Sequence, residues 1–324
     1  MKKLEKIAKK IINESLKIKN NERVLILTDP KRYDLANSFF KVCSKKHDTV
    51  ILTIKEMKYD GAKLSDFVKQ HLKICDVLLA YTTMSVSHTK SVLEARSKGV
   101  RVASLPGITK DIYKRAIDVD FKKMANYTNK LKEIFIKGEK VKVTSKKGTN
   151  ITFLIKNRPI YELNAICTKK GDFINLPDGE MMVAPVENSM NGKIVIDLSM
   201  MPDQMTEYGI IGKLENENIT LNVENGEIIN YSNNKASNIL KNVIKSADKN
   251  ANIIAEFAIG TNPKAKIIGN ILEDEKVLQT CHFAFGSNTT FGGKNQSNIH
   301  LDGIIDKPTI YLDGKKIIAN GNLI

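Results

Sequence analysis

Hydrophobic patterning changes along this chain of 324 residues and divides it into two parts. In the first part, short runs that are apolar at nearly every position alternate with segments of helical apolar spacing. Strands that are apolar on both faces are typical of a parallel sheet that helices cover on both sides. We therefore expect a doubly wound, Rossmann-like α/β domain over residues 1–137. Its predicted strands are Val24–Thr28, Thr49–Ile54, Asp76–Tyr81 and Val100–Leu105.

The segments between these runs predict helices over residues 34–43, 61–72 and 91–98. Asp29-Pro30 ends the first strand, and neither a G-x-G-x-x-G loop nor a P-loop follows it. Backbone amides of such glycine-rich loops are what usually bind a dinucleotide or a triphosphate. We therefore expect no nucleotide cofactor in this domain.

After residue 138 the apolar residues repeat with a period of two, which is typical of antiparallel strands with one buried face. Two hairpins are predicted, one around Gly148 and one around Asn225-Gly226, which favours a tight turn. A helical pattern over residues 235–250 is the main exception. We therefore expect residues 138–324 to form a second domain that is mainly antiparallel β, of the α+β class.

Composition excludes several functional classes. The net charge of +15 is carried mostly by lysine, spread along the chain without interleaved aromatic residues, so we expect no specific nucleic-acid partner. No apolar stretch reaches the roughly 18 residues that a membrane-spanning helix needs. The 4 cysteines form no C-x-x-C pair, which indicates reduced thiols rather than a disulfide framework. We expect a cytoplasmic protein without a membrane partner.

Candidate metal ligands gather in the last part of the chain. His300 and Asp302 are two residues apart, so on a strand both side chains leave the same face. His282 is a possible third ligand from a neighbouring segment. Taken alone, the H-x-D pattern also fits a polar strand end with an incidental histidine and aspartate.

Two glutamates stand in unusual settings. Glu180 follows a turn at the start of an apolar strand, and Glu256 lies in the middle of an apolar run. A buried carboxylate is costly unless it is paired or bound to a metal. A salt bridge to a lysine satisfies each glutamate separately. The two glutamates taken together with His282, His300 and Asp302 favour a metal site in residues 138–324.

The order of these motifs resembles the aminopeptidase T family, the M29 metallopeptidases. The matching blocks are N-x-P-x-G-E ending at Glu180, E-x-x-x-G-x-N from Glu256, H-x-A-x-G from His282, a loop with Gly292-Gly293, and H-x-D from His300. The resemblance covers most of the chain and is most specific between residues 256 and 314. It implies a cytoplasmic, usually dimeric, two-metal exopeptidase that removes N-terminal residues from peptides.

On this resemblance Glu180, Glu256, His282, His300 and Asp302 match the family's metal ligands. They imply two divalent ions per chain, zinc, cobalt or manganese, which generate a metal-bound hydroxide that attacks a peptide carbonyl. Glu180 or Glu256 would act as the catalytic proton shuttle. A homodimer and a peptide substrate are implied as well.

Two other functions use or ignore the same residues. His282, His300 and Asp302 alone form the two-histidine, one-carboxylate set of non-haem iron(II) oxygenases. Ring-cleaving dihydroxypyridine dioxygenases, which look similar to the peptidase family, keep such a triad, so this is the alternative function with iron as its metal. The third alternative is a basic protein without enzymatic activity that binds nucleic acid in a salt-dependent manner.

Overall fold

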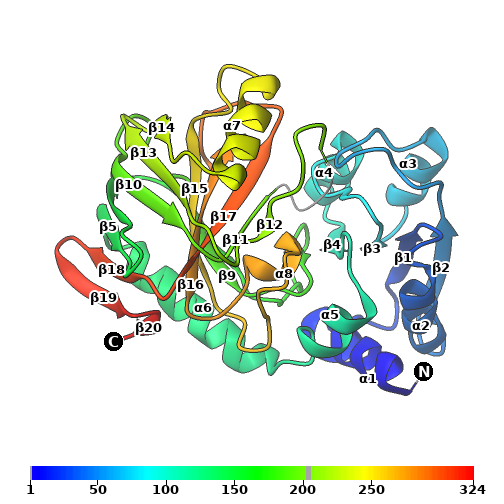
Figure 1. Cartoon of the computed structure of the whole chain (residues 1–324). Helices are drawn as coiled ribbons and strands as arrows, with labels where there is room; N and C mark the ends of the chain where they lie inside the picture. Colours follow the sequence, from blue (N-terminus) through cyan, green and yellow to red (C-terminus); the bar gives the residue numbers. More distant parts are fainter. Residues whose placement is uncertain (1, 202–205) are drawn as a thin grey trace. The chain divides into compact units, whose positions relative to one another are not determined.

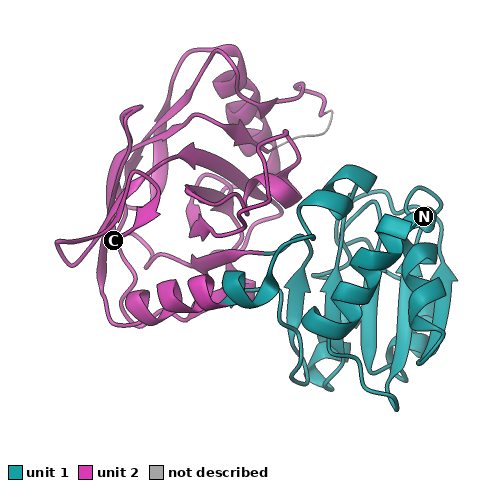
Figure 2. Cartoon of the chain, turned by 90° about the horizontal axis from the view of Figure 1, so that it is seen from below, with its two compact units in different colours: residues 1–125, 163–178 teal, residues 126–162, 179–324 magenta. Residues whose placement is uncertain are grey.

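The computed structural model describes residues 2–201 and 206–324. The chain forms two compact units, which are coloured separately in Figure 2. One unit comprises the residues up to Ala125 together with Leu163–Asp178, and the other comprises Asn126–Glu162 and Gly179–Ile324. The domain boundary expected between residues 137 and 138 stays a prediction.

The first unit is built on a parallel sheet with the strand order β2-β1-β3-β4-β8 (Figure 1). Helices separate successive strands along the chain, as the apolar pattern predicts. The elements are α1 Lys2–Lys10, a π-helix Ile11–Ser15, β1 Arg23–Thr28, α2 Tyr33–Cys43, β2 Asp48–Thr53, α3 Asp66–Leu72, β3 Val77–Tyr81, α4 Lys90–Ser97, β4 Arg101–Ser104, α5 Lys110–Arg115 and β8 Phe173–Asn175. The helix α6, Phe121–Phe135, leads into the second unit.

All predicted strands of this unit are confirmed, but two details differ from expectation. Strand β2 is at the sheet edge, and its Val50 is 50% exposed although the sequence there is apolar. The helix expected from residue 61 begins only at Asp66, because the Ser65 side chain accepts a hydrogen bond from the Val68 amide and caps the helix there.

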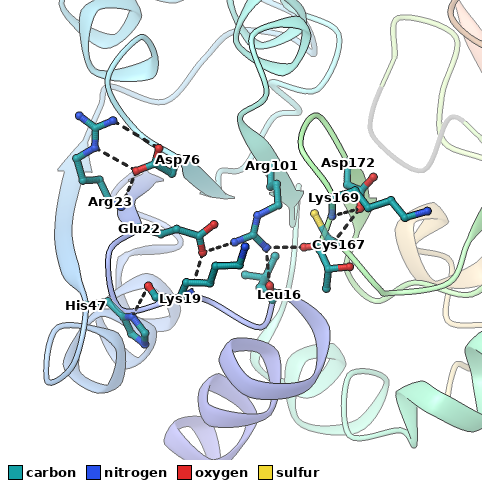
Figure 3. Close-up of polar contacts among 11 residues, drawn as sticks. Leu16, Lys19, Glu22, Arg23, His47, Asp76, Arg101, Cys167, Lys169 and Asp172 are labelled. Atoms are coloured by element: carbon teal, nitrogen blue, oxygen red, sulfur yellow. Dashed lines mark hydrogen bonds and ion pairs between the residues drawn. The ribbon is translucent and has the colours of Figure 1, made fainter.

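A buried arginine joins three segments of the first unit (Figure 3). The Arg101 guanidinium donates to the carbonyl oxygens of Leu16 and Cys167, at 2.5 and 2.6 Å, and to the Glu22 carboxylate at 2.5 Å. Its side chain is 4% exposed and that of Glu22 is 16% exposed. The returning segment that carries Cys167 is thereby tied to the turn that precedes β1.

The Thr89 side chain caps the N-terminus of helix α4. The Thr89 side chain accepts from the Val92 amide and donates to the Val86 carbonyl. Thr89→Ala is expected to lower the free energy of unfolding by about 1 kcal/mol, because one helix amide loses its cap. Urea denaturation followed by circular dichroism measures this change. Ser97→Ala, in the last turn of the same helix, is the control, and an equal loss there would contradict the capping explanation.

The second unit contains two antiparallel sheets, of order β14-β13-β10-β6-β5-β18-β19-β20 and β12-β11-β17-β16-β15-β9-β7. Their strands are β5 Lys140–Thr144, β6 Asn150–Leu154, β7 Ile160–Leu163, β9 Glu180–Val183, β10 Asn191–Ile196, β11 Ser199–Met200, β12 Gly212–Lys213, β13 Ile219–Glu224, β14 Glu227–Tyr231, β15 Ile254–Gly260, β16 Thr280–Gly286, β17 His300–Asp306, β18 Thr309–Leu312, β19 Lys315–Ala319 and β20 Asn322–Leu323. The helices are α7 Lys235–Ala247 and α8 Ile271–Asp274.

Both predicted hairpins are confirmed. Strands β5 and β6 pair around Gly148, and β13 and β14 pair around Asn225-Gly226, whose φ angles of 48° and 79° suit a tight primed turn. Helix α7 is shorter than expected and ends at Ala247. The chain is thus a mixed α/β protein with a parallel sheet and antiparallel sheets.

One hydrophobic core lies between the two sheets of the second unit. Side chains of Val141, Phe153 and Ile194 from the first sheet pack in the same cluster as Phe257 and Phe283 from the second. The Phe153 and Phe257 rings are 5.1 Å apart between centroids, and those of Phe257 and Phe283 are 5.3 Å apart. This core leaves the opposite face of the second sheet for other side chains.

Candidate metal centre

Alternation along the central strands of the second sheet separates a core face from a polar face. In β16, Cys281, Phe283 and Phe285 belong to the hydrophobic core. The residues between them, His282, Ala284 and Gly286, therefore lie on the other face. The same rule places Glu256 of β15 opposite the core-facing Phe257, and His300 and Asp302 of β17 opposite Leu301.

Strand register brings the candidate ligands together on that polar face. Ala284 pairs with Glu256 on one side and with Asp302 on the other, His300 pairs with Gly286, and Glu180 of β9 pairs with Gly260. Small residues thus stand beside the larger polar ones across the sheet. This arrangement leaves room for the imidazoles and carboxylates to converge, and the predicted shared face of His300 and Asp302 is confirmed.

The five candidate residues form a compact buried cluster. The His282 Nε2 atom is 3.5 Å from Glu256 Oε1, 3.6 Å from Glu180 Oε2 and 4.0 Å from Asp302 Oδ1. The His300 Nε2 atom is 3.2 Å from Glu256 Oε2 and 3.5 Å from Asp302 Oδ1. All are buried except His300, whose side chain is 34% exposed. Of these five side chains, His300 has the most access to solvent.

The His300 ring is oriented from outside the cluster. Its Nδ1 lies 2.8 Å from the Ser287 carbonyl oxygen, which can only accept, so Nδ1 carries a proton and Nε2 faces the carboxylates. The Phe291 ring meets the imidazole edge-on, with centroids 5.9 Å apart. An imidazole fixed in this tautomer is the form that a metal ligand requires.

The carboxylates create a field that favours positive charge at both imidazoles. Burial alone lowers the pKa of His282, but the carboxylates of Glu256, Glu180 and Asp302 outweigh it and raise that pKa to about 9. Burial likewise opposes the charge on His300, yet Asp302 and Glu256 raise its pKa well above the usual value. Burial raises the pKa of Glu256, but the neighbouring imidazoles of His282 and His300 more than compensate and bring it below its usual range. The same field favours a metal cation.

Unsatisfied buried atoms test whether a metal fits this donor set. Among residues 2–201 and 206–324, Glu180 Oε2 and both ring nitrogens of His282 are buried without a hydrogen-bond partner. Buried polar atoms are rarely left so, because their desolvation is costly. Imidazole nitrogens and carboxylate oxygens are ligands for iron, zinc or manganese. The cluster therefore fits a divalent metal ion.

Two residues near the centre escaped prediction from the sequence. Glu275 and Lys276 follow α8, and Glu275 forms a possible ligand group with His282 and Asp302. Burial raises the pKa of Glu275 to about 8, against the lowering effect of Lys276. Their segment, Glu273-Asp274-Glu275-Lys276, reads in the sequence as an exposed charged run. The apolar residues on both sides of it were the only signal that it is buried.

The donor atoms fall into overlapping sets. Within the described part of the chain, the groups whose ligand atoms all lie within 4.8 Å of one another are Glu180 with Glu256 and His282, Glu256 with His300 and Asp302, and Glu275 with His282 and Asp302. Among the described residues, no such group contains both imidazoles. Asp302 nevertheless presents one oxygen, Oδ1, to both of them, whereas Glu256 presents a different oxygen to each.

Comparison with known sequences decides the family. The sequence matches the family described as NicX, 2,5-dihydroxypyridine 5,6-dioxygenase, over residues 8–324. The chain belongs to this dioxygenase family. The matched range contains every candidate ligand and covers both units.

One curated relative from this dioxygenase family has low sequence identity to the chain. It is the 2,5-dihydroxypyridine 5,6-dioxygenase of Pseudomonas putida, which is 24% identical over 192 residues, or 56% of this chain and 53% of the relative. The match thus spans about half the length of that curated relative.

Solved structures agree with the fold. The 2,5-dihydroxypyridine dioxygenase structure from Pseudomonas putida has a TM-score of 0.84 at 17% identity and covers 99% of this chain and 96% of its own. Wild-type AmpT from Thermus thermophilus has a TM-score of 0.75 at 14% identity and covers 100% of this chain and 99% of its own. At such identities the likeness concerns the fold.

These findings correct the functional prediction. The assignment to the M29 aminopeptidases, and with it the hydrolase activity on peptides, is wrong, because the family match and the curated relative are dioxygenases. The alternative function given from the sequence is the one they favour. The resemblance to the peptidases reflects a shared fold, as the likeness to AmpT indicates.

In the described residues, no helix is both long enough and apolar enough to cross a membrane.

Proposed function

We propose that this chain is an iron(II)-dependent dioxygenase that cleaves the ring of a 2,5-dihydroxypyridine, with His282, His300 and Asp302 as the iron ligands. The family match over residues 8–324 carries this proposal. The name of the curated relative gives its substrate and places its reaction at ring positions 5 and 6. Bound iron(II) would supply the site for the substrate's oxygen atoms and for the activation of O₂.

The ligand set follows from the chemistry and position of the donors. Two imidazoles and one carboxylate are the pattern of non-haem iron(II) oxygenases, which leave open positions for substrate and oxygen. Asp302 is the best-placed carboxylate because its Oδ1 atom faces both imidazoles, at 4.0 and 3.5 Å. The Ser287 carbonyl holds the His300 ring so that Nε2 is available as a ligand.

Glu256 would act on the substrate rather than on the metal. Its carboxylate is 3% exposed and lies 3.2 to 3.5 Å from the two imidazoles, so it is beside any ligand that the triad holds. The nearby imidazoles hold the pKa of Glu256 below its usual range, and an ionised carboxylate can accept the proton of a ring hydroxyl. Phe291, against the His300 ring, would shield that side of the centre from water.

Oxygen consumption tests the function. Protein loaded anaerobically with iron(II) and mixed with 2,5-dihydroxypyridine is expected to consume one O₂ per ring opened, while the absorbance of the aromatic ring disappears. Removal of the iron by a chelator should stop both changes, and iron(II), not zinc, should restore them. Oxygen uptake that does not change with the iron content would overturn the assignment.

The proposal extends to the character of the two units. We propose that the second unit binds the metal and that the first unit is a doubly wound α/β domain. A homodimer, a cytoplasmic location and the lack of a specific nucleic-acid partner stay predictions from the sequence.

A further inference from the structure

A lysine is buried beside the candidate metal centre. The Lys276 side chain is 1% exposed, and its Nζ atom lies 2.5 Å from Glu180 Oε1 and 2.7 Å from Glu275 Oε1. The other oxygen of Glu180, Oε2, faces His282 Nε2 at 3.6 Å. Glu180 therefore lies between an ammonium group on one side and the metal-binding imidazole on the other.

The backbone of this lysine is held close to the ligand-bearing sheet. The Lys276 carbonyl accepts from the Asn262 amide at 2.8 Å, and its own amide donates to the Glu273 carbonyl at 3.0 Å. Gly260, which pairs with Glu180, makes the approach possible, because a Cβ atom there would be 2.1 Å from the Val277 carbonyl oxygen. These backbone contacts thus hold the Lys276 residue beside Glu180.

We propose that the Lys276 ammonium takes the place of a second cation between Glu180 and Glu275 and so restricts the centre to a single metal ion. The inference deepens the proposed function, on which it rests, because a mononuclear iron site is what that function needs. It accounts for Glu180, a carboxylate that the His282, His300 and Asp302 triad leaves unused.

Electrostatics decides between one ion and two. Glu180 lies in one donor group with Glu256 and His282. Because His282 would bind the iron, the two carboxylates are what this group offers to a second divalent ion. An ion bound there by Glu180 would share that carboxylate with a buried ammonium group. Like charges that close repel strongly where water does not screen them. The Lys276 ammonium, which contacts both Glu180 and Glu275, supplies a positive charge there without a second dication.

Metal stoichiometry tests this inference without any measurement of activity. Manganese(II) serves as the probe, and binding to dialysed protein is followed by calorimetric titration and by elemental analysis. The wild type is expected to bind one ion per chain and Lys276→Gln two, because the glutamine removes the positive charge. Lys276→Arg keeps the charge and should bind one ion. Two ions in the wild type, or one ion in a folded Lys276→Gln protein, would overturn the inference.

A second variant keeps the test decisive if Lys276→Gln does not fold. Glu180→Gln still accepts a hydrogen bond from Lys276. If Glu180 serves the lysine rather than an ion, the manganese dissociation constant of Glu180→Gln should rise by no more than about 100-fold, the upper end of what a residue beside a ligand contributes. A larger rise would mean that Glu180 is a metal ligand and would contradict the inference.

The result is separable from the proposed function. A change from one ion to two in Lys276→Gln supports the role of the lysine even if 2,5-dihydroxypyridine is not a substrate. Conversely, an active dioxygenase in which Lys276→Gln still binds one ion retains its function and loses this explanation.

Discussion

Replacing His282 by alanine is expected to remove iron from the protein and to abolish oxygen consumption with 2,5-dihydroxypyridine. His282 lies on the central strand β16, and its Nε2 atom is within 4.0 Å of oxygens from Glu180, Glu256 and Asp302. Residues that merely support metal ligands typically contribute about 10- to 100-fold to metal affinity or activity. Loss of a ligand itself should exceed the upper end of that range.

The measurement is iron content and oxygen uptake on the same preparations. His71→Ala is the matched control, because it removes a half-buried histidine of the first unit whose described ring contacts are with Phe67 of its own helix. Circular dichroism should show that both variants are folded. Iron retention and near-normal turnover in His282→Ala would rule out this histidine as a ligand.

The sequence predicted which polar side chains lie together better than it predicted their function. Period-two alternation was sufficient to place His300 and Asp302 on one face, and an isolated charge in an apolar run was sufficient to single out Glu256. Such patterns report which side chains share a buried face. They contain no information on whether one ion or two bind there, so the same residues supported a peptidase and a dioxygenase.

What the sequence could not show depends on contacts between distant segments. Lys276 lies in a charged run that normally indicates a solvated surface, and only tertiary packing buries it beside Glu180, 96 residues away along the chain. Similarly, Val50 belongs to an apolar run but is exposed, because strand order places β2 at an edge. Neither sheet order nor loop packing follows from local patterning.

Arg101→Met is expected to destabilise the protein by about 3 to 5 kcal/mol, the cost typical of breaking a buried ion pair by removal of one partner. The substitution preserves much of the side-chain volume but removes the donors to Leu16, Cys167 and Glu22. The Glu22 carboxylate, 16% exposed, would then retain only the Lys19 amide among the donors described. Urea denaturation followed by circular dichroism measures the loss.

Two comparisons separate this explanation from a general intolerance of substitution. Arg23→Ala removes an ion pair with Asp76 of the same unit, but its partners are 54% and 38% exposed, so solvent screening should make the change small. The double variant Arg101→Met with Glu22→Gln should recover part of the lost stability, because the buried negative charge is removed with its partner. If the double variant is no more stable than Arg101→Met, the unpaired carboxylate is not the cause, and the two carbonyl contacts account for the loss.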